Sequence, residues 1–211
     1  SYVRIHAIFR KSGIPESAAA WLAWSVKLRA DGRNDEADAR LAALLTRWPG
    51  DLPALRVAAS VAVGRERLDE LLRLVPPTLL LQETEDNASL LAFRARSKAA
   101  SGDSTGARAD ALRAVALSGG NPWVLVQAGD AFASSDPALA RDYWTRALYR
   151  LLEKPGTRGG AIWVRFRLAR QHEREGRAGD ALREWRTILA ERPDDVEAKR
   201  RVAALTGASP P

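Results

Sequence analysis

The side chains that could carry out catalysis are few in this sequence. It contains no cysteine, which excludes a thiol nucleophile, a disulfide and a thiolate metal site. The only two histidines are His6 and His172, and His172 lies on the apolar stripe of a helical pattern, where a histidine packs more often than it reacts. No second histidine follows His172 one turn later, as an H-E-x-x-H zinc site requires. We therefore predict a protein that is not an enzyme and that has neither a cofactor nor a metal site.

Two other stretches resemble catalytic motifs in composition only. Residues 101–108 (SGDSTGAR) contain glycines, but no lysine after them and no strand pattern before them, so they predict a turn rather than a phosphate-binding loop. Asp194 and Asp195 are adjacent and suit the start of a helix, so they do not face each other across a cleft. Neither stretch changes the prediction of a non-catalytic protein.

The composition indicates helices throughout. Alanine, leucine and arginine dominate, whereas there are only 4 Phe and 3 Tyr, and this balance favours helices over sheets. The formal net charge is +7, with 33 Lys and Arg against 26 Asp and Glu. Because the two signs are interleaved, we favour solvated helix faces with pairs at i, i+4. A polyanion partner, which would be a nucleic acid or an acidic polysaccharide, is the alternative.

The first residues suggest a piece cut from a longer protein. The sequence has no methionine and begins inside an apolar helical pattern, which predicts a helix over residues 1–12. No apolar run approaches the roughly 18 residues that a membrane crossing needs. We therefore predict no membrane span in this chain.

A spacing of glycine and alanine recurs along the chain. Gly176 stands five residues before Ala181, and the same spacing occurs twice upstream. A fourth copy has Ser135 in place of the glycine, followed by Ala140 and Trp144. A helix terminator stands twelve residues after each of the first three alanines. The upstream glycine and alanine pairs are Gly32 with Ala37 and Gly102 with Ala107, and the terminators are Pro49, Gly119 and Pro193. Each copy therefore predicts two helices joined by a tight turn.

The period of about 34 residues resembles the tetratricopeptide repeat family. A small residue stands where the two helices of a repeat cross in that family, and this sequence has Ser25, Ala95, Gly129 and Ala169 at those places. The usual early aromatic is Trp21 in the first repeat but Leu91 and Arg165 in two others, and Lys98 replaces a later aromatic in the third. The third copy is therefore degenerate. The resemblance implies an all-α, right-handed α-solenoid of stacked antiparallel helix pairs.

The resemblance and the terminators together give one superhelical domain over residues 1–211. After the helix at 1–12, we place repeats at about 18–51, 52–77, 88–120, 121–155 and 162–195. A last helix at 195–206 would cover the apolar end of the stack, as terminal repeats require.

The first helices of successive pairs line a concave groove in this family, and the resemblance implies the same here. The face that the packing stripe leaves free carries Trp163, Phe166, Arg167 and Arg170 in the last repeat. Its counterparts in the third repeat are Phe93 and Arg96, and those in the fourth repeat are Trp123, Val126, Gln127 and Asp130. Aromatic anchors and arginine forks in one groove would bind a partner. The other interpretation is that Trp123 and Trp163 fill the space between adjacent repeats, because aromatics at helical spacing are usually core.

From these expectations we predict that the chain is a scaffold for protein–protein interaction. The places of the family's Lys and Asn clamp for a C-terminal carboxylate hold Leu22 and Val26, so we expect a helix or an extended apolar segment as the partner. By analogy, the chain is similar to repeat segments of bacterial envelope proteins that export exopolysaccharide or assemble outer-membrane complexes. We accordingly expect a periplasmic location, with the cytoplasm as the alternative. The groove could also touch polysaccharide, whereas nucleic acid is not expected.

Overall fold

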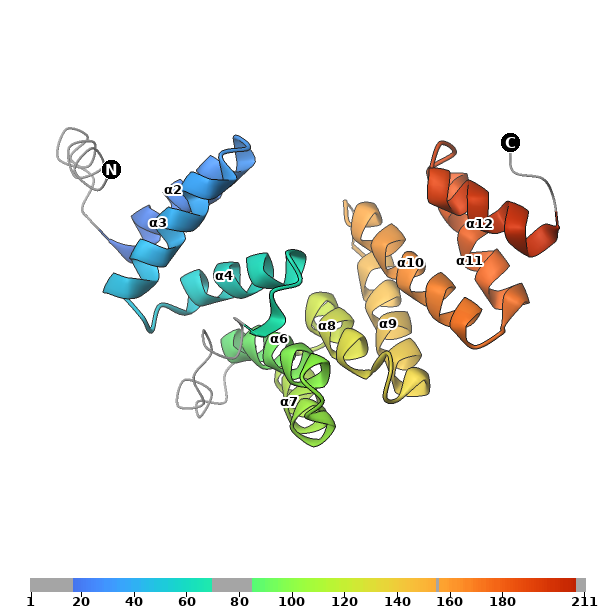
Figure 1. Ribbon diagram of the computed structural model, residues 1–211, viewed down its shortest axis with the longest axis horizontal. Coiled ribbons are helices and arrows are strands. Elements are labelled where there is room, and N and C mark those ends of the chain that lie inside the picture. Colours follow the sequence, from blue (N-terminus) through green and yellow to red (C-terminus); the bar gives the residue numbers. More distant parts are fainter. Residues whose placement is uncertain (1–16, 70–84, 155, 208–211) are drawn as a thin grey trace. The chain divides into compact units, whose positions relative to one another are not determined.

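The computed structural model describes residues 17–69, 85–154 and 156–207, and these residues form ten α-helices and no strand (Figure 1). The all-α class and the consecutive packing of helices are therefore confirmed for the described ranges. The chain divides into two compact units, Ser1–Gln82 and Glu83–Pro211. The helix predicted at 1–12 lies outside the described residues, as does most of the second half of the predicted repeat 52–77. The prediction of one continuous domain stays a prediction.

The first unit contains α2 (Ala18–Ala30), α3 (Asn34–Arg47) and α4 (Leu52–Gly64). The hydroxyl of Ser25 in α2 donates a hydrogen bond of 2.9 Å to the carbonyl of Ala37 in α3, and both residues are buried. Only a small side chain at position 25 lets the two backbones come this close. Trp21 is also buried and packs edge to face on Trp48, with ring centroids 5.9 Å apart.

The second unit contains three helix pairs and a final single helix. The pairs are α6 (Glu85–Ala100) with α7 (Ser104–Leu117), α8 (Pro122–Phe132) with α9 (Pro137–Leu152), and α10 (Arg158–Arg174) with α11 (Ala178–Glu191), and α12 (Val196–Thr206) follows. Each first helix packs against its second, and α12 packs against α11 (Figure 1). The first helix of the last pair begins at Arg158 rather than at 162.

The glycine of the repeat turn has a backbone requirement. Gly32, Gly102 and Gly176 have φ angles of 77°, 87° and 70°, in the left-handed region that residues with a side chain rarely adopt. The fourth copy has Ser135 there, and Ser135 does not adopt a positive φ. Instead, the Asp136 carboxylate accepts a hydrogen bond from the Leu139 N–H and caps α9. Three of the turns therefore use a glycine in the left-handed region, and the fourth is followed by an aspartate that caps the next helix.

The degenerate third repeat is held by buried charge. Asp110 of α7 is only 6% exposed, and it accepts two hydrogen bonds of 2.7 Å from the Arg94 guanidinium of α6. The ammonium of Lys98, which replaces the family's aromatic, lies 2.9 Å from the same carboxylate. Burial raises the pKa of Asp110, but the hydrogen bonds from Arg94 and Lys98 outweigh burial and hold the pKa below its ordinary value. An ion cluster therefore replaces aromatic packing in this repeat.

The crossing of α8 and α9 depends on the lack of a side chain at Gly129. The buried Trp144 of α9 donates from Nε1 to the Val126 carbonyl at 3.3 Å and to the Asp130 carboxylate at 3.1 Å. A Cβ atom at Gly129 would lie 2.5 Å from that nitrogen and 2.6 Å from Cδ1 of the same indole. Trp144 is therefore held over the glycine by both packing and hydrogen bonds.

We predict that Gly129→Ala destabilises the chain by about 1–3 kcal/mol, although alanine has the higher helix propensity, because Trp144 must leave its hydrogen bonds to make room. Thermal and urea unfolding would measure the change. Gly179→Ala in α11 is the matched control, because a Cβ there meets no atom within 4 Å, and it should be neutral or slightly stabilising. An equal change in unfolding free energy for the two variants would contradict the packing of Trp144 over Gly129.

Candidate functional site

Two exposed tryptophans define the candidate site, which lies on α8 and α10. The side chain of Trp123 is 48% exposed and that of Trp163 is 53% exposed. Trp123 lies against the N-terminal turn of α10, where a Cβ atom at Gly160 would be only 2.8 Å from the indole Cη2. Trp163 is one helical turn beyond Gly160 on the same face of α10. We call Trp123, Trp163 and Arg167 the tryptophan platform.

The platform corrects the interpretation that the two tryptophans fill the space between repeats. Trp123 does contact the following repeat, because Gly160 leaves room for the edge of its ring, but about half of its surface stays accessible. Trp163 is the more exposed of the two. The helical pattern placed Trp163 on the face that the packing stripe leaves free, and the buried stripe of α10 does run elsewhere, through Ile162, Val164, Leu168 and Ala169.

Asp130 of α8 joins four helices beneath the platform. Its side chain is 9% exposed and accepts hydrogen bonds from Arg167 of α10 at 2.6 and 3.0 Å. It also accepts one of 3.1 Å from Arg96 of α6 and one of 3.1 Å from the Trp144 indole of α9. One carboxylate therefore satisfies two guanidinium groups and one indole N–H. We call these four residues the Asp130 node.

The Asp130 node corrects the expectation that the groove arginines are free to bind anions. Arg96 and Arg167 direct their N–H groups at Asp130, and Arg170 is paired in the same way with Glu197 of α12, at 3.2 and 2.8 Å. A guanidinium group that is already bound to a carboxylate has fewer N–H donors free for an external anion. The sequence does not show this pairing, because the partners lie about 30 residues apart on other helices.

Arg167 also covers one face of Trp163. Its guanidinium carbon lies 4.1 Å from the centroid of the indole, which is a cation–π contact. Because Asp130 holds Arg167 by two hydrogen bonds, the arginine has little freedom, and it restricts the tryptophan in turn. About half of the Trp163 surface stays accessible beside this contact.

The remaining predicted site residues have other surroundings. Phe166 packs edge to face on the buried Trp185 at 5.3 Å between centroids, so it belongs to the packing of α10 on α11. Arg170 lies over Phe166 at 5.8 Å. Phe93 on α6 is half-buried. The structure thus brings Arg96 and Arg167 onto Asp130 and Trp163 against Arg167, and it places Phe166 and Arg170 towards α11 and α12; the role of all these residues in binding a partner stays a prediction.

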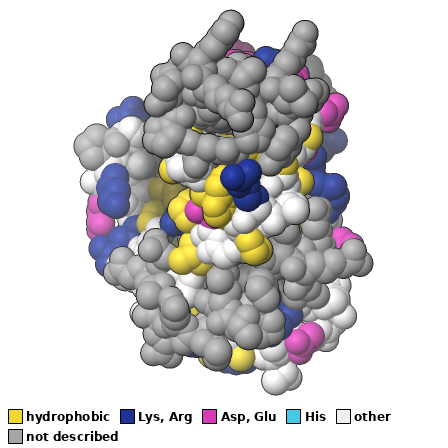
Figure 2. Space-filling view, turned by 90° about the vertical axis from the view of Figure 1, so that its left-hand side faces the viewer, with side chains coloured by type: hydrophobic (Ala, Val, Ile, Leu, Met, Phe, Trp, Pro, Cys, Tyr) yellow, Lys and Arg dark blue, Asp and Glu magenta, His cyan; other side chains and the backbone are white. Residues whose placement is uncertain are grey.

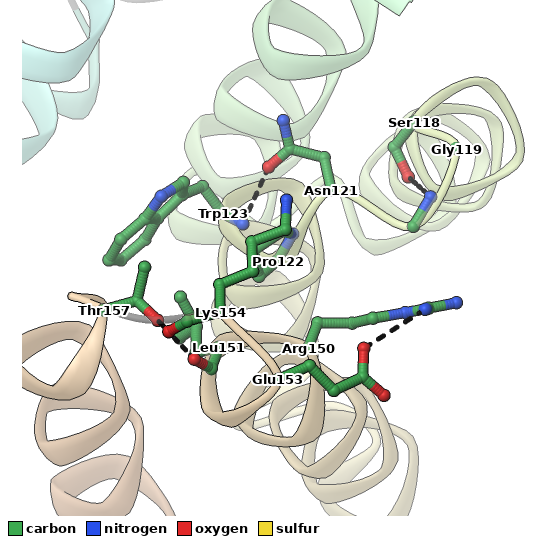
Figure 3. Close-up of a pocket in the computed structure, with 11 residues that line it drawn as sticks. Ser118, Gly119, Asn121, Pro122, Trp123, Arg150, Leu151, Glu153, Lys154 and Thr157 are labelled. Carbon is green, nitrogen blue, oxygen red and sulfur yellow. Dashed lines mark hydrogen bonds and ion pairs between the residues drawn. The ribbon is translucent and has the colours of Figure 1, made fainter.

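An open pocket adjoins the platform and has a volume of about 460 Å³. Trp123 and Arg150 lie on opposite sides of it (Figure 3). The sequence analysis did not select Arg150 or Lys154 for the site. The signal that points to them is the extra turn of α9 before Pro155, which brings basic residues to the start of α10.

For the described residues, the structure shows the surroundings of His172, the positions of side chains that can bind a metal ion and the apolar character of the helices. His172 is half-buried, and burial together with the nearby Arg177 lowers its pKa, so it is neutral at pH 7. Among the described residues, no three His, Cys, Asp or Glu side chains are grouped so as to hold a metal ion. None of the helices in those ranges has both the length and the apolar character needed to cross a membrane.

The fold is that of tetratricopeptide repeat proteins. One similar solved structure is a chain of the APC/C hetero-tetramer Cut9–Hcn1, with a TM-score of 0.72 and 18% identity over 97% of this chain. The present chain spans 39% of the length of that chain. Another is a tetratricopeptide repeat protein from Parabacteroides merdae, with a TM-score of 0.51 and 16% identity, covering 90% of this chain and 72% of the other. At these identities the likeness shows the fold.

No protein-family model matches the sequence. No curated protein matches it either.

We predict that Asp130→Asn destabilises the chain by about 3–5 kcal/mol, because two arginine side chains lose a largely buried carboxylate. Unfolding in urea would measure the loss, and the indole resonance of Trp163 in a heteronuclear NMR spectrum should shift. Asp142→Asn removes an exposed carboxylate, paired with Arg146 at 3.4 Å, and should change stability by less than about 0.5 kcal/mol. A mild effect at Asp130 would show that the node does not stabilise the fold.

Proposed function

We propose that this chain is a non-catalytic scaffold for protein–protein interaction and that its partner binds across the tryptophan platform. The observation that carries the proposal is the pair of half-exposed tryptophans, of which Trp163 lies against Arg167, whose guanidinium is hydrogen-bonded to the largely buried Asp130. Exposed aromatic side chains that are already restricted lose little entropy on binding, and tryptophan is enriched among the residues that dominate binding energy. The tetratricopeptide repeat fold supports a protein partner.

An apolar segment of the partner fits the platform better than a polyanion does. The arginines around Asp130 are engaged with carboxylates of the chain itself, so they do not form a free basic patch. Figure 2, which faces the left-hand side of Figure 1, shows lysine and arginine side chains at several separate places, with a few acidic ones. The indole surfaces of Trp123 and Trp163 can pack against a helix or an extended segment.

The net charge of +7 favours the second candidate, which is a nucleic acid or an acidic polysaccharide. Sugar rings can also stack on exposed indoles. This candidate requires binding that falls steeply with salt, because neutralised phosphates or carboxylates release counterions. The protein partner requires only a modest dependence on salt.

The finer part of the proposal concerns the parent protein. We place the chain in a larger bacterial envelope protein that exports exopolysaccharide or assembles outer-membrane complexes, with a periplasmic location. The alanine, leucine and arginine bias looks like that of a high-GC bacterium. The placement in an envelope protein rests on analogy with repeat segments of such proteins. Fractionation of cells that produce the parent protein would test the location.

We predict that Trp163→Ala weakens partner binding by about 2 kcal/mol or more, because a central aromatic anchor is removed. Affinity capture from bacterial envelope and cytosolic extracts would compare this variant with the unchanged chain. Tyr149→Ala on α9 is the matched control, since Tyr149 is 65% exposed and lies outside the platform.

A protein captured by the unchanged chain and by Tyr149→Ala, but lost with Trp163→Ala, would support the proposal. Capture that is identical for all three chains would contradict it. Titration with single-stranded and duplex oligonucleotides and with an acidic polysaccharide, at several salt concentrations, would distinguish the second candidate.

A further inference from the structure

The pocket beside Trp123 is built from three segments of the second unit. The loop between α7 and α8 forms one wall, the end of α9 forms the floor, and the start of α10 closes one side (Figure 3). Its volume of about 460 Å³ lies within the range of ligand-binding clefts. The residues that matter for its chemistry are Gly120, Trp123, Arg150, Leu151, Lys154 and Thr157.

The cations of this pocket are available, unlike those of the Asp130 node. Arg150 has one ion pair among the described residues, at 3.5 Å to Glu153, and the two side chains are 56% and 63% exposed. Such a long, exposed pair contributes little and is easily exchanged. Lys154 is exposed and has no carboxylate partner within the described ranges. Two cations against one carboxylate leave the pocket with a surplus positive charge.

Both cations are exposed, but the Arg150 guanidinium has a neighbouring loop backbone and the backbone at Lys154 has a hydrogen-bonding neighbour. The guanidinium of Arg150 lies along the loop backbone, where a Cβ atom at Gly120 would be 3.5 Å from its Nε and Nη2. Gly120 has a φ of 83°, which a residue with a side chain rarely adopts. The hydroxyl of Thr157 lies within hydrogen-bonding distance of the carbonyls of Leu151 and Lys154 and donates to one of them at a time. This contact joins the end of α9 to the start of α10.

The apolar side of the pocket is the indole of Trp123, with the buried Leu151 near it. Trp123 also belongs to the tryptophan platform, so the pocket and the platform share one side chain. A ligand that covers Trp123 from the pocket side can continue along α10 towards Trp163.

We propose that this pocket binds an acidic stretch of the partner protein, with an apolar side chain against Trp123 and carboxylates on Lys154 and Arg150. The inference rests on the proposed function and specifies which part of the partner the second unit recognises. Charge complementarity supports it, because carboxylates on a flexible peptide can form forked hydrogen bonds with Arg150 and replace Glu153. A surplus of one positive charge suits a short acidic stretch better than a uniformly charged polymer.

The test is selection from a display library of random peptides with the whole chain as bait. The selected peptides should contain Asp or Glu beside an aromatic or aliphatic residue. Synthetic versions should bind about tenfold more weakly when their acidic residues are changed to the amides. The double variant Arg150→Gln, Lys154→Gln should weaken binding by at least the same factor. The matched control is Arg183→Gln, Lys199→Gln, which removes the same charge from exposed positions on α11 and α12 and should bind normally.

Circular dichroism would show that each double variant is folded, which is expected because Arg150, Lys154 and Arg183 are exposed and the side chain of Lys199 is 43% exposed. Three outcomes would overturn the inference: no enrichment of any peptide, enriched peptides without acidic residues, or binding that is insensitive to the Arg150 and Lys154 changes. Binding of an oligogalacturonate but of no peptide would likewise overturn it, in favour of an acidic polysaccharide. Peptides that depend on Trp163 but not on Arg150 and Lys154 would leave the proposed function standing and remove only the pocket.

Discussion

The candidate site of the second unit depends on the hydrogen bonds that the carboxylate of Asp130 accepts. This carboxylate lies almost buried on α8 and accepts hydrogen bonds from Arg96, Arg167 and Trp144, which belong to α6, α10 and α9. A buried carboxylate is tolerable only when its oxygens are fully hydrogen-bonded, and this one joins three successive helix pairs. The first helices α8 and α10 are thus connected through side chains at the Asp130 node and at the contact of Trp123 with Gly160.

This arrangement separates charges that hold the fold from charges that can bind a ligand. Arg96 and Arg167 are both paired with the carboxylate of Asp130, and Arg167 also covers one face of Trp163. Arg150 and Lys154, in contrast, remain accessible at the pocket. The formal charge of the chain is a poor guide to its partner for this reason. Within the described ranges, many of the arginines are paired with carboxylates of the chain itself.

The sequence predicted the helix pairs because their signals are local. A left-handed glycine, a helix-start alanine and a terminator repeat at fixed spacing, and each has a physical requirement that the structure shows, as at Gly102 and Gly176. The site was predicted only in part. Trp163 and Arg167 were selected from helical spacing, but the exposure of Trp163 and the pairing of Arg167 with Asp130 depend on how α10 stands against α8. The basic pocket was missed because Arg150 and Lys154 come close to Trp123 only through folding.

The most direct test of the scaffold account is photo-crosslinking in the native cells. A benzoylphenylalanine residue in place of Trp163 keeps an aromatic ring on the platform and reacts only with what lies against it. The account predicts one discrete protein adduct at this position and none when the same residue replaces the exposed Tyr149 of α9. The absence of any protein adduct at position 163, or the same set of adducts at both positions, would contradict the claim that a partner binds on the tryptophan platform.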